Sequence, residues 1–138
     1  MKTPITLYFI MLIFIATLTA CESEVCLACT EELRTEFVAV RDQAQNPLAL
    51  DEFSVFNTRM NQKVGPDWTA EEVETFRETG RYPLIDDAHI LASKTLQIQF
   101  RGFLHGAQII TENYVVASDC CSHITCVEGN QDLTVSTD

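Results

Sequence analysis

The sequence predicts a mainly β fold, an antiparallel β-sandwich of about seven short strands with one short inserted helix. Two observations favour this class. Short runs of β-branched and aromatic residues alternate with turn-forming residues through most of the chain. Only one stretch, residues 69–80, has the residue pattern of a helix.

The clearest strand pattern is TLQIQF at 95–100, where Leu96, Ile98 and Phe100 fall on one face. YPLIDD at 82–87 predicts an edge strand. Pro83 has no N–H to donate to a neighbouring strand, so it is tolerated only at a sheet edge or at the start of a strand. Further strands are predicted over 34–42, 51–60, 108–118, 123–129 and 132–136. The last two are expected to form a hairpin, and GFLHGAQ at 102–108 is expected to form a turn.

The predicted helix has signals at both ends. Thr69 is a suitable N-cap, and Glu72 three residues later completes the capping-box pattern. Gly80 stands where a helix-terminating glycine is favoured. The helix is so short that we expect it to need the rest of the domain for stability.

The first twenty residues have the order of a secretory signal peptide, with Lys2, an apolar run and then small residues. The apolar run is shorter than the roughly 20 residues that span a bilayer. We therefore expect a signal peptide at 1–20, an N-terminal tether at 21–32 and a β-sandwich domain at 33–138.

Leu18-Thr19-Ala20-Cys21 resembles the lipobox of bacterial lipoproteins. The resemblance implies that cleavage precedes Cys21 and that this cysteine is lipidated. We expect the chain to contact the membrane through this lipid anchor, in the cell envelope and at the outer membrane of a Gram-negative bacterium. The alternatives are an ordinary signal peptide followed by a chance cysteine, or an uncleaved anchor helix.

FVAVRDQAQNPLALDEFSVFN, which begins at Phe37, resembles the opening of carboxypeptidase-regulatory or transthyretin-like sandwiches. YPLIDD, QFRGF and the DCC segment are similar to small uncharacterised envelope lipoproteins of Gram-negative bacteria. These resemblances imply an immunoglobulin- or transthyretin-like sandwich and an envelope location. They imply no activity.

The charge balance argues against nucleic acid as a partner. The chain has 9 Lys and Arg against 20 Asp and Glu, a net charge of −11. Such a surface repels phosphate backbones, and no basic cluster is present to bind them. We expect the partner to be another envelope protein or a small ligand, in addition to the membrane.

Six cysteines fall in two groups near the ends of the expected domain. Apart from Cys21, the disulfide candidates are Cys26, Cys29, Cys120, Cys121 and Cys126. Since these five are an odd number, at most two bridges form and one thiol is left over. A bridge between the groups closes a loop of about 90 residues, worth roughly 4–5 kcal/mol. Of the adjacent pair Cys120 and Cys121, we expect one to form a bridge and the other to pack as a small apolar group.

Metal binding is the alternative use of these cysteines. Cys26-x-x-Cys29, Cys120, Cys121, Cys126 and His123 offer sulfur and imidazole ligands suited to zinc or copper. The second group lacks regular C-x-x-C spacing, and an oxidising compartment favours disulfides. We therefore expect no metal site and no cofactor, with a metal-binding envelope lipoprotein as the alternative function.

No catalytic motif is present in the sequence: it has no G-x-S-x-G, H-E-x-x-H or glycine-rich phosphate loop. A thioredoxin-like role for Cys26 and Cys29 would need a βαβ context that is missing. His89 and His105 are interpreted as surface residues, and the acidic pairs at 51–52 and 86–87 as solvated turns. The sequence thus predicts no catalytic residues and a non-enzymatic binding or structural module.

Overall fold

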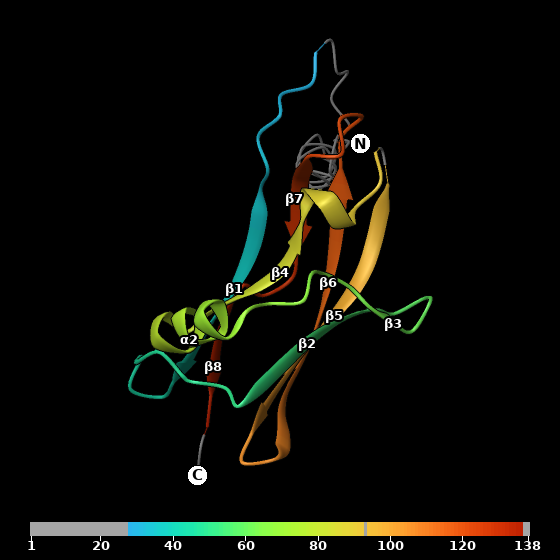
Figure 1. Cartoon of the computed structure of the whole chain (residues 1–138). Helices are drawn as coiled ribbons and strands as arrows, with labels where there is room; N and C mark the ends of the chain where they lie inside the picture. The colour runs from blue at the N-terminus through green and yellow to red at the C-terminus, as the bar shows by residue number, and fades with distance from the viewer. Residues whose placement is uncertain (1–27, 93, 137–138) are drawn as a thin grey trace, which may run out of the picture.

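The computed structural model describes residues 28–92 and 94–136, which form a mainly β sandwich of two sheets with one α-helix (Figure 1). The predicted fold class is confirmed. The elements are β1 Thr35–Asp42, β2 Glu52–Asn57, β3 Gln62–Lys63, α2 Ala70–Thr79, β4 Arg81–Asp86, the 3₁₀ turn η2 Asp87–His89, β5 Thr95–Leu104, β6 Ala107–Ser118, β7 Ile124–Glu128 and β8 Asp132–Val135.

One sheet has three strands in the order β4-β1-β8, and the other has five in the order β3-β2-β5-β6-β7. All neighbouring strands are antiparallel except β1 and β8, which pair in parallel from Ala39↔Asp132 to Asp42↔Val135. The predicted hairpin of the last two strands is therefore wrong. β7 ends in the five-stranded sheet, and the chain crosses to the other sheet before β8 begins.

The central hairpin of the five-stranded sheet is longer than the sequence pattern indicates. β5 continues through Gly102 to Leu104, so the predicted turn over 102–108 shrinks to His105 and Gly106. A side chain at position 102 would meet Leu50 and Ile110 at 2.9–3.0 Å. Gly102 thus belongs to the strand and allows close packing there, rather than marking a turn.

The core lies between the two sheets and is formed by alternate residues of the strands. Every strand except the two-residue β3 contributes at least one buried apolar side chain. The largest fully buried side chains are Tyr82, Tyr114, Phe100, Leu50, Leu84, Ile98, Val38, Val40 and Val116.

Helix α2 begins and ends where the sequence predicts. The Thr69 hydroxyl accepts from the Glu72 N–H, and the Glu72 carboxylate accepts from the Thr69 N–H at 2.8 Å. Gly80 ends the helix with φ +64°, and a Cβ there would lie 2.7 Å from the Val40 oxygen. None of the helix residues is buried, and Phe76 packs only partly on the core. No helix among the described residues has the length and apolar character to cross a membrane.

Tyr82→Phe is expected to destabilise the domain by about 1–3 kcal/mol, because two buried backbone groups lose their partner. The Tyr82 hydroxyl donates to the Leu48 oxygen at 2.8 Å and accepts from the Leu50 N–H at 2.7 Å. Burial also raises the pKa of Tyr82. Urea unfolding measures the loss. Tyr114→Phe removes a single hydrogen bond, to the Asn130 oxygen, and should cost less. Equal losses would contradict the double role of Tyr82.

Candidate functional site

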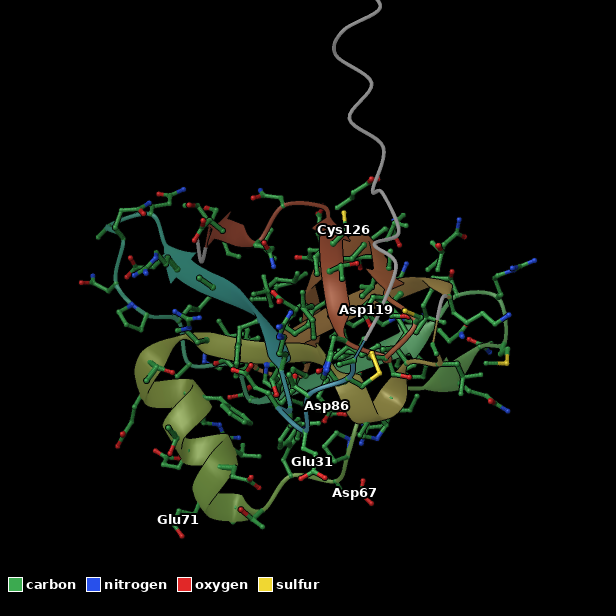
Figure 2. The ribbon with its side chains drawn as sticks, turned by 90° about the horizontal axis from the view of Figure 1, so that it is seen from above. Glu31, Asp67, Glu71, Asp86, Asp119 and Cys126 are labelled. Carbon is green, nitrogen blue, oxygen red and sulfur yellow. A yellow bond between two sulfur atoms is a disulfide. The ribbon has the colours of Figure 1, made fainter. Side chains whose placement is uncertain are left out.

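The described N-terminal segment is fastened to one end of the sandwich by a disulfide between Cys29 and Cys121. The two cysteines are 92 residues apart in sequence, and their Cα atoms are 5.3 Å apart. This bond joins the two cysteine groups as predicted. In Figure 2 it lies close to the labelled Asp119 and Asp86. We call this end of the molecule, formed by Thr30, Asp87, Asp119, His123 and the disulfide, the tether junction.

A tight turn over residues 119–123 presents Cys121 and His123 to the tether junction. The Asp119 carboxylate accepts from the N–H groups of Cys121 at 2.8 Å and His123 at 2.9 Å. Ser122 adopts a positive φ of 66° within the turn. An aspartate that bonds its own downstream backbone is a common way to stabilise such a turn.

Asp87 is the acceptor at the centre of the tether junction, and only 8% of its surface is exposed. One carboxylate oxygen accepts from the Ile124 N–H at 2.8 Å. The other contacts His123 Nδ1 at 2.8 Å and accepts from the Arg34 N–H at 3.0 Å. Burial alone would raise the pKa of Asp87, but the hydrogen bonds from His123, Ile124 and Arg34 outweigh it and lower the pKa.

Both ring nitrogens of His123 have hydrogen-bond partners at the tether junction. Nδ1 faces the Asp87 carboxylate, and Nε2 lies 3.1 Å from the Thr30 carbonyl oxygen. A proton on Nε2 would be donated to this oxygen, because a carbonyl oxygen can only accept. The hydrogen bond to Asp87 raises the pKa of His123, with burial opposing it and the charges of Asp87 and Asp119 adding to the rise.

Thr30, His123 and Asp87 stand in the order of a hydroxyl–imidazole–carboxylate triad. The Thr30 hydroxyl lies 3.3 Å from His123 Nε2. A general base needs a lone pair on that nitrogen, and the tautomer that bonds the Thr30 carbonyl oxygen at 3.1 Å has none there. The arrangement therefore acts as a clamp that ties Thr30 to the sandwich, and the prediction of no catalytic residues stays a prediction.

His123→Gln is expected to remove part of the pH dependence of stability. A histidine with a raised folded pKa adds stability that is complete below its unfolded pKa of about 6.5 and is lost as pH rises through the folded value. Asp87, with a lowered folded pKa, adds stability above about pH 3.9 that is lost as pH falls further. As pH rises above about 6.5, urea titrations should show the wild-type free energy of unfolding falling more steeply than that of the variant. His105→Gln, in an exposed turn, should keep the wild-type slope.

Asp86 and Asp87 are not the solvated pair that the sequence predicts. Both are buried, with 7% and 8% of their surface exposed. Asp86 Oδ1 lies 2.5 Å from His89 Nδ1, so the exposed His89 is hydrogen-bonded to it. The apolar residues of β4 next to this pair indicate that the two carboxylates are buried. Nothing near residue 87 in the sequence indicates that Asp87 pairs with His123, 36 residues away. His105 is exposed as predicted.

The cysteine predictions are confirmed in part. Cys120 and Cys126 are disulfide-bonded in addition to Cys29 and Cys121, and no cysteine among the described residues is a free thiol. The expectation that one of Cys120 and Cys121 packs as an apolar group is wrong, because Cys120 is exposed and both are oxidised. The predictions for Cys21 and Cys26 lie outside the described residues.

The proposed zinc or copper ligands do not form a metal site within the described part of the chain, where no group of three or more His, Cys, Asp or Glu is placed to hold an ion. The four described cysteines are consumed in disulfides, and both nitrogens of His123 are engaged. A thiolate ligand requires a reduced sulfur, so these oxidised cysteines do not fit a zinc or copper site.

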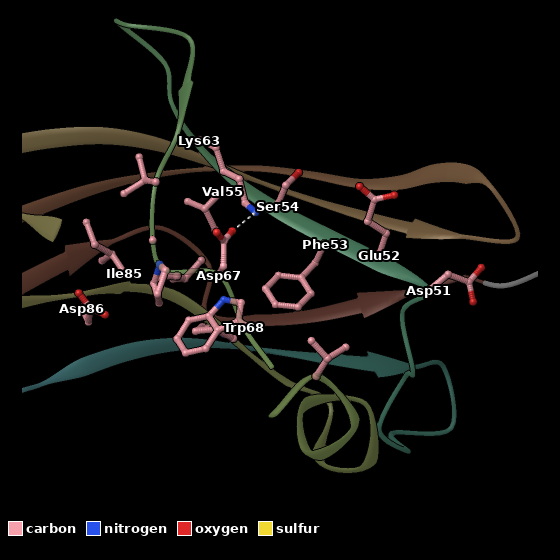
Figure 3. A pocket seen from close by; sticks show the side chains of 16 residues that line it. Asp51, Glu52, Phe53, Ser54, Val55, Lys63, Asp67, Trp68, Ile85 and Asp86 are labelled. Carbon is pink, nitrogen blue, oxygen red and sulfur yellow. Dashed lines mark ion pairs between the residues drawn. The ribbon is translucent and has the colours of Figure 1, made fainter. Parts of the chain in front are cut away.

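A second feature, which the sequence did not indicate, is a cavity of about 290 Å³ at the side of the sandwich. It lies between β2 of one sheet and the edge strand β4 of the other, and the segment 64–68 and Val73 of α2 complete its wall (Figure 3). Phe53, Val55 and Trp68 line it together with the β4 residues Pro83, Leu84 and Ile85. We call it the side cavity.

The polar groups of the side cavity are mostly acidic. Asp51, Glu52, Asp67 and Asp86 line it, and Lys63 is the single cationic side chain among the lining residues. Lys63 Nζ lies 3.6 Å from Asp67 Oδ1, an ion pair drawn as a dashed line in Figure 3. Neither the Glu52 carboxylate nor the Trp68 indole N–H bonds to any other described residue.

The fold and these two features define a disulfide-stapled β-sandwich with a clamped N-terminal segment and a small side cavity. Compared with known proteins, the chain matches no family model, no curated protein and no solved structure. The transthyretin-like and lipoprotein resemblances therefore stay predictions.

Proposed function

We propose that this chain is a lipid-anchored, non-enzymatic binding module of the cell envelope, held at the outer membrane of a Gram-negative bacterium through Cys21. The observation that carries the proposal is the Cys29–Cys121 disulfide, directly downstream of the lipobox-like Leu18-Thr19-Ala20-Cys21. Disulfides form and persist outside the reducing cytoplasm, so oxidised cysteines and an export signal support the same compartment.

The tether junction would connect such an anchor firmly to the folded domain. A lipid at Cys21 transmits any pull on the domain through residues 22–28 to Cys29. The disulfide and the clamp of Asp87, His123 and Thr30 then pass this force to the body of the sandwich. Two or three acyl chains at one cysteine would make the attachment firm, because each buried methylene adds about 0.8 kcal/mol.

A binding role suits the geometry better than catalysis does. The one hydroxyl–imidazole–carboxylate row among the described residues has its basic nitrogen bonded to a carbonyl. The described cysteines are oxidised and offer no thiolate nucleophile. The side cavity, by contrast, is concave, largely apolar and lined by a few polar groups, which are the properties of small-ligand sites.

Metabolic labelling with a palmitate analogue tests the anchor. The full chain is expected to take up the label and to fractionate with outer membranes on a density gradient, whereas Cys21→Ser should do neither. Cys26→Ser is the matched control, since it removes a neighbouring cysteine outside the lipobox pattern and should keep the label.

Peptide mass spectrometry without reduction provides the decisive second measurement. A sulfur that carries a diacylglycerol has no valence left for a disulfide, so an acylated Cys21 is recovered on a lipid-modified peptide. Recovery of Cys21 in a disulfide with any other cysteine, or an unlabelled wild-type chain, would refute the anchor.

A further inference from the structure

We propose that the side cavity is a binding site for a small organic cation, a ligand with a ring-sized apolar body and one positively charged amine. The inference deepens the binding role proposed above and does not depend on acylation of Cys21. It rests on the size of the cavity, on its aromatic walls and on the excess of carboxylates among its lining residues.

The size of the cavity selects a small molecule. Its volume of about 290 Å³ is at the lower end of ligand pockets, which run from about 300 to 1,000 Å³. A folded peptide or a lipid chain needs more room. The cavity is therefore suited to a single ring with a short substituent.

The walls offer aromatic surface to such a ring. Trp68 and Phe53 both line the cavity, and each makes an edge contact with Phe76, with centroids 5.2 and 5.9 Å away. Phe76 thus fixes the orientation of both rings from the helix side. Figure 3 shows Trp68 and Phe53 on either side of the space below Asp67. Aromatic rings held in this way bind both apolar rings and cations.

The charges select a cation. Among the lining residues four carboxylates stand against one ammonium, and Lys63 is already paired with Asp67. Asp86 is paired with His89, and the Asp51 carboxylate accepts from the His105 N–H. Glu52 is the carboxylate without a partner among the described residues, and it is exposed on β2 at the cavity. Because the lining residues carry more carboxylates than cationic groups, an amine is attracted to the cavity and a carboxylate is repelled.

The segment 64–68 forms one wall of the cavity. Residues 64–68 connect β3 to α2, and Gly65 adopts a φ of +98°, which a residue with a side chain rarely reaches. Pro66 follows it and restricts the next step of the backbone. The exposed Lys63–Asp67 ion pair spans this turn and is weak enough to open, because surface pairs contribute little.

The chain carries its own reporter for a binding test. Trp68 is the only tryptophan in the sequence and lines the cavity, so its fluorescence reports occupancy directly. The full chain is titrated with phenethylamine, phenethyl alcohol and phenylacetate, which share a ring and a two-carbon chain or its close equivalent but differ in charge. We expect saturable binding of the amine about tenfold tighter than the alcohol, and no binding of the carboxylate.

Two variants locate the site. Val73→Phe, on the helix side of the cavity, should fill it and abolish amine binding. Glu52→Gln, at an exposed position that leaves the fold unaffected, should weaken amine binding about threefold and leave alcohol binding unchanged. Glu71→Gln, exposed on α2 outside the cavity, is the matched control and should change neither.

Three outcomes would overturn the inference. Equal affinity for amine and alcohol would make the ligand neutral, and binding that survives Val73→Phe in a folded variant would place the site elsewhere. A flat fluorescence titration with all three probes would leave the cavity without this ligand class. A chain that binds the amine but takes up no palmitate label would refute the lipid anchor and leave the amine site intact. Failure of the anchor is therefore distinguishable from failure of the binding site.

Discussion

Asp87→Ala is expected to destabilise the domain by about 2–4 kcal/mol, because a single carboxylate serves three donors at the tether junction. The buried Ile124 N–H would lose its partner. His123 would lose the hydrogen bond to Asp87 that is the main cause of its raised pKa. Urea unfolding at pH 6, below the ordinary pKa of histidine, measures the loss.

Two further variants test whether Asp87 stabilises the tether junction by accepting from three donors. Asp87→Asn keeps one acceptor oxygen and should lose less than Asp87→Ala. Asp67→Ala removes an exposed surface carboxylate from an ion pair and should change stability by less than about 1 kcal/mol. If Asp87→Ala cost no more than Asp67→Ala, the clamp described for the tether junction would not exist.

The double variant Cys29→Ser with Cys121→Ser is expected to lose about 2–5 kcal/mol of unfolding free energy. The two cysteines enclose most of the folded chain, so the unfolded state gains much freedom when the bond is absent. Replacing both cysteines avoids a free thiol that could exchange with the remaining disulfides at Cys120 and Cys126.

The site of the loss is measurable as well as its size. Hydrogen exchange at the Arg34 N–H, which donates to Asp87, should accelerate more in the double variant than exchange within β5 or β6. An unchanged urea midpoint together with unchanged exchange at Arg34 would show that the disulfide adds nothing to the fold.

The sequence predicts the local elements of this fold well and its long-range pairing poorly. TLQIQF alternates cleanly because one face of β5 is buried, and the Thr69–Glu72 box and Gly80 mark the helix ends by short-range chemistry. β8 carries no mark of its parallel partner β1, because the choice between a hairpin and a crossing depends on which sheet offers a free edge. The helix is thus predicted correctly because interactions between near neighbours in the sequence determine it. The hairpin is predicted wrongly because contacts between distant segments decide where β8 pairs.

The candidate sites divide in the same way. Cysteine grouping predicts a bridge between the two groups, which the Cys29–Cys121 bond confirms, but it does not predict which cysteines form it. Nothing in the sequence joins Asp87 to His123, because a buried ion pair is specified by geometry at the end of a strand and not by spacing. The side cavity arises from the gap between two strands of different sheets, which no local pattern records.

The parallel pairing of β1 with β8 has a consequence for how the chain is made. The first strand of the domain lies between β4 and the last strand, so its hydrogen-bond ladder stays incomplete until residues 132–135 have arrived. A ribosome releases the N-terminal part long before that, and pairing between distant segments is slow. The three-stranded sheet is therefore complete only when the last strand of the domain has been synthesised, whereas the β1–β4 pairing needs only residues up to 86.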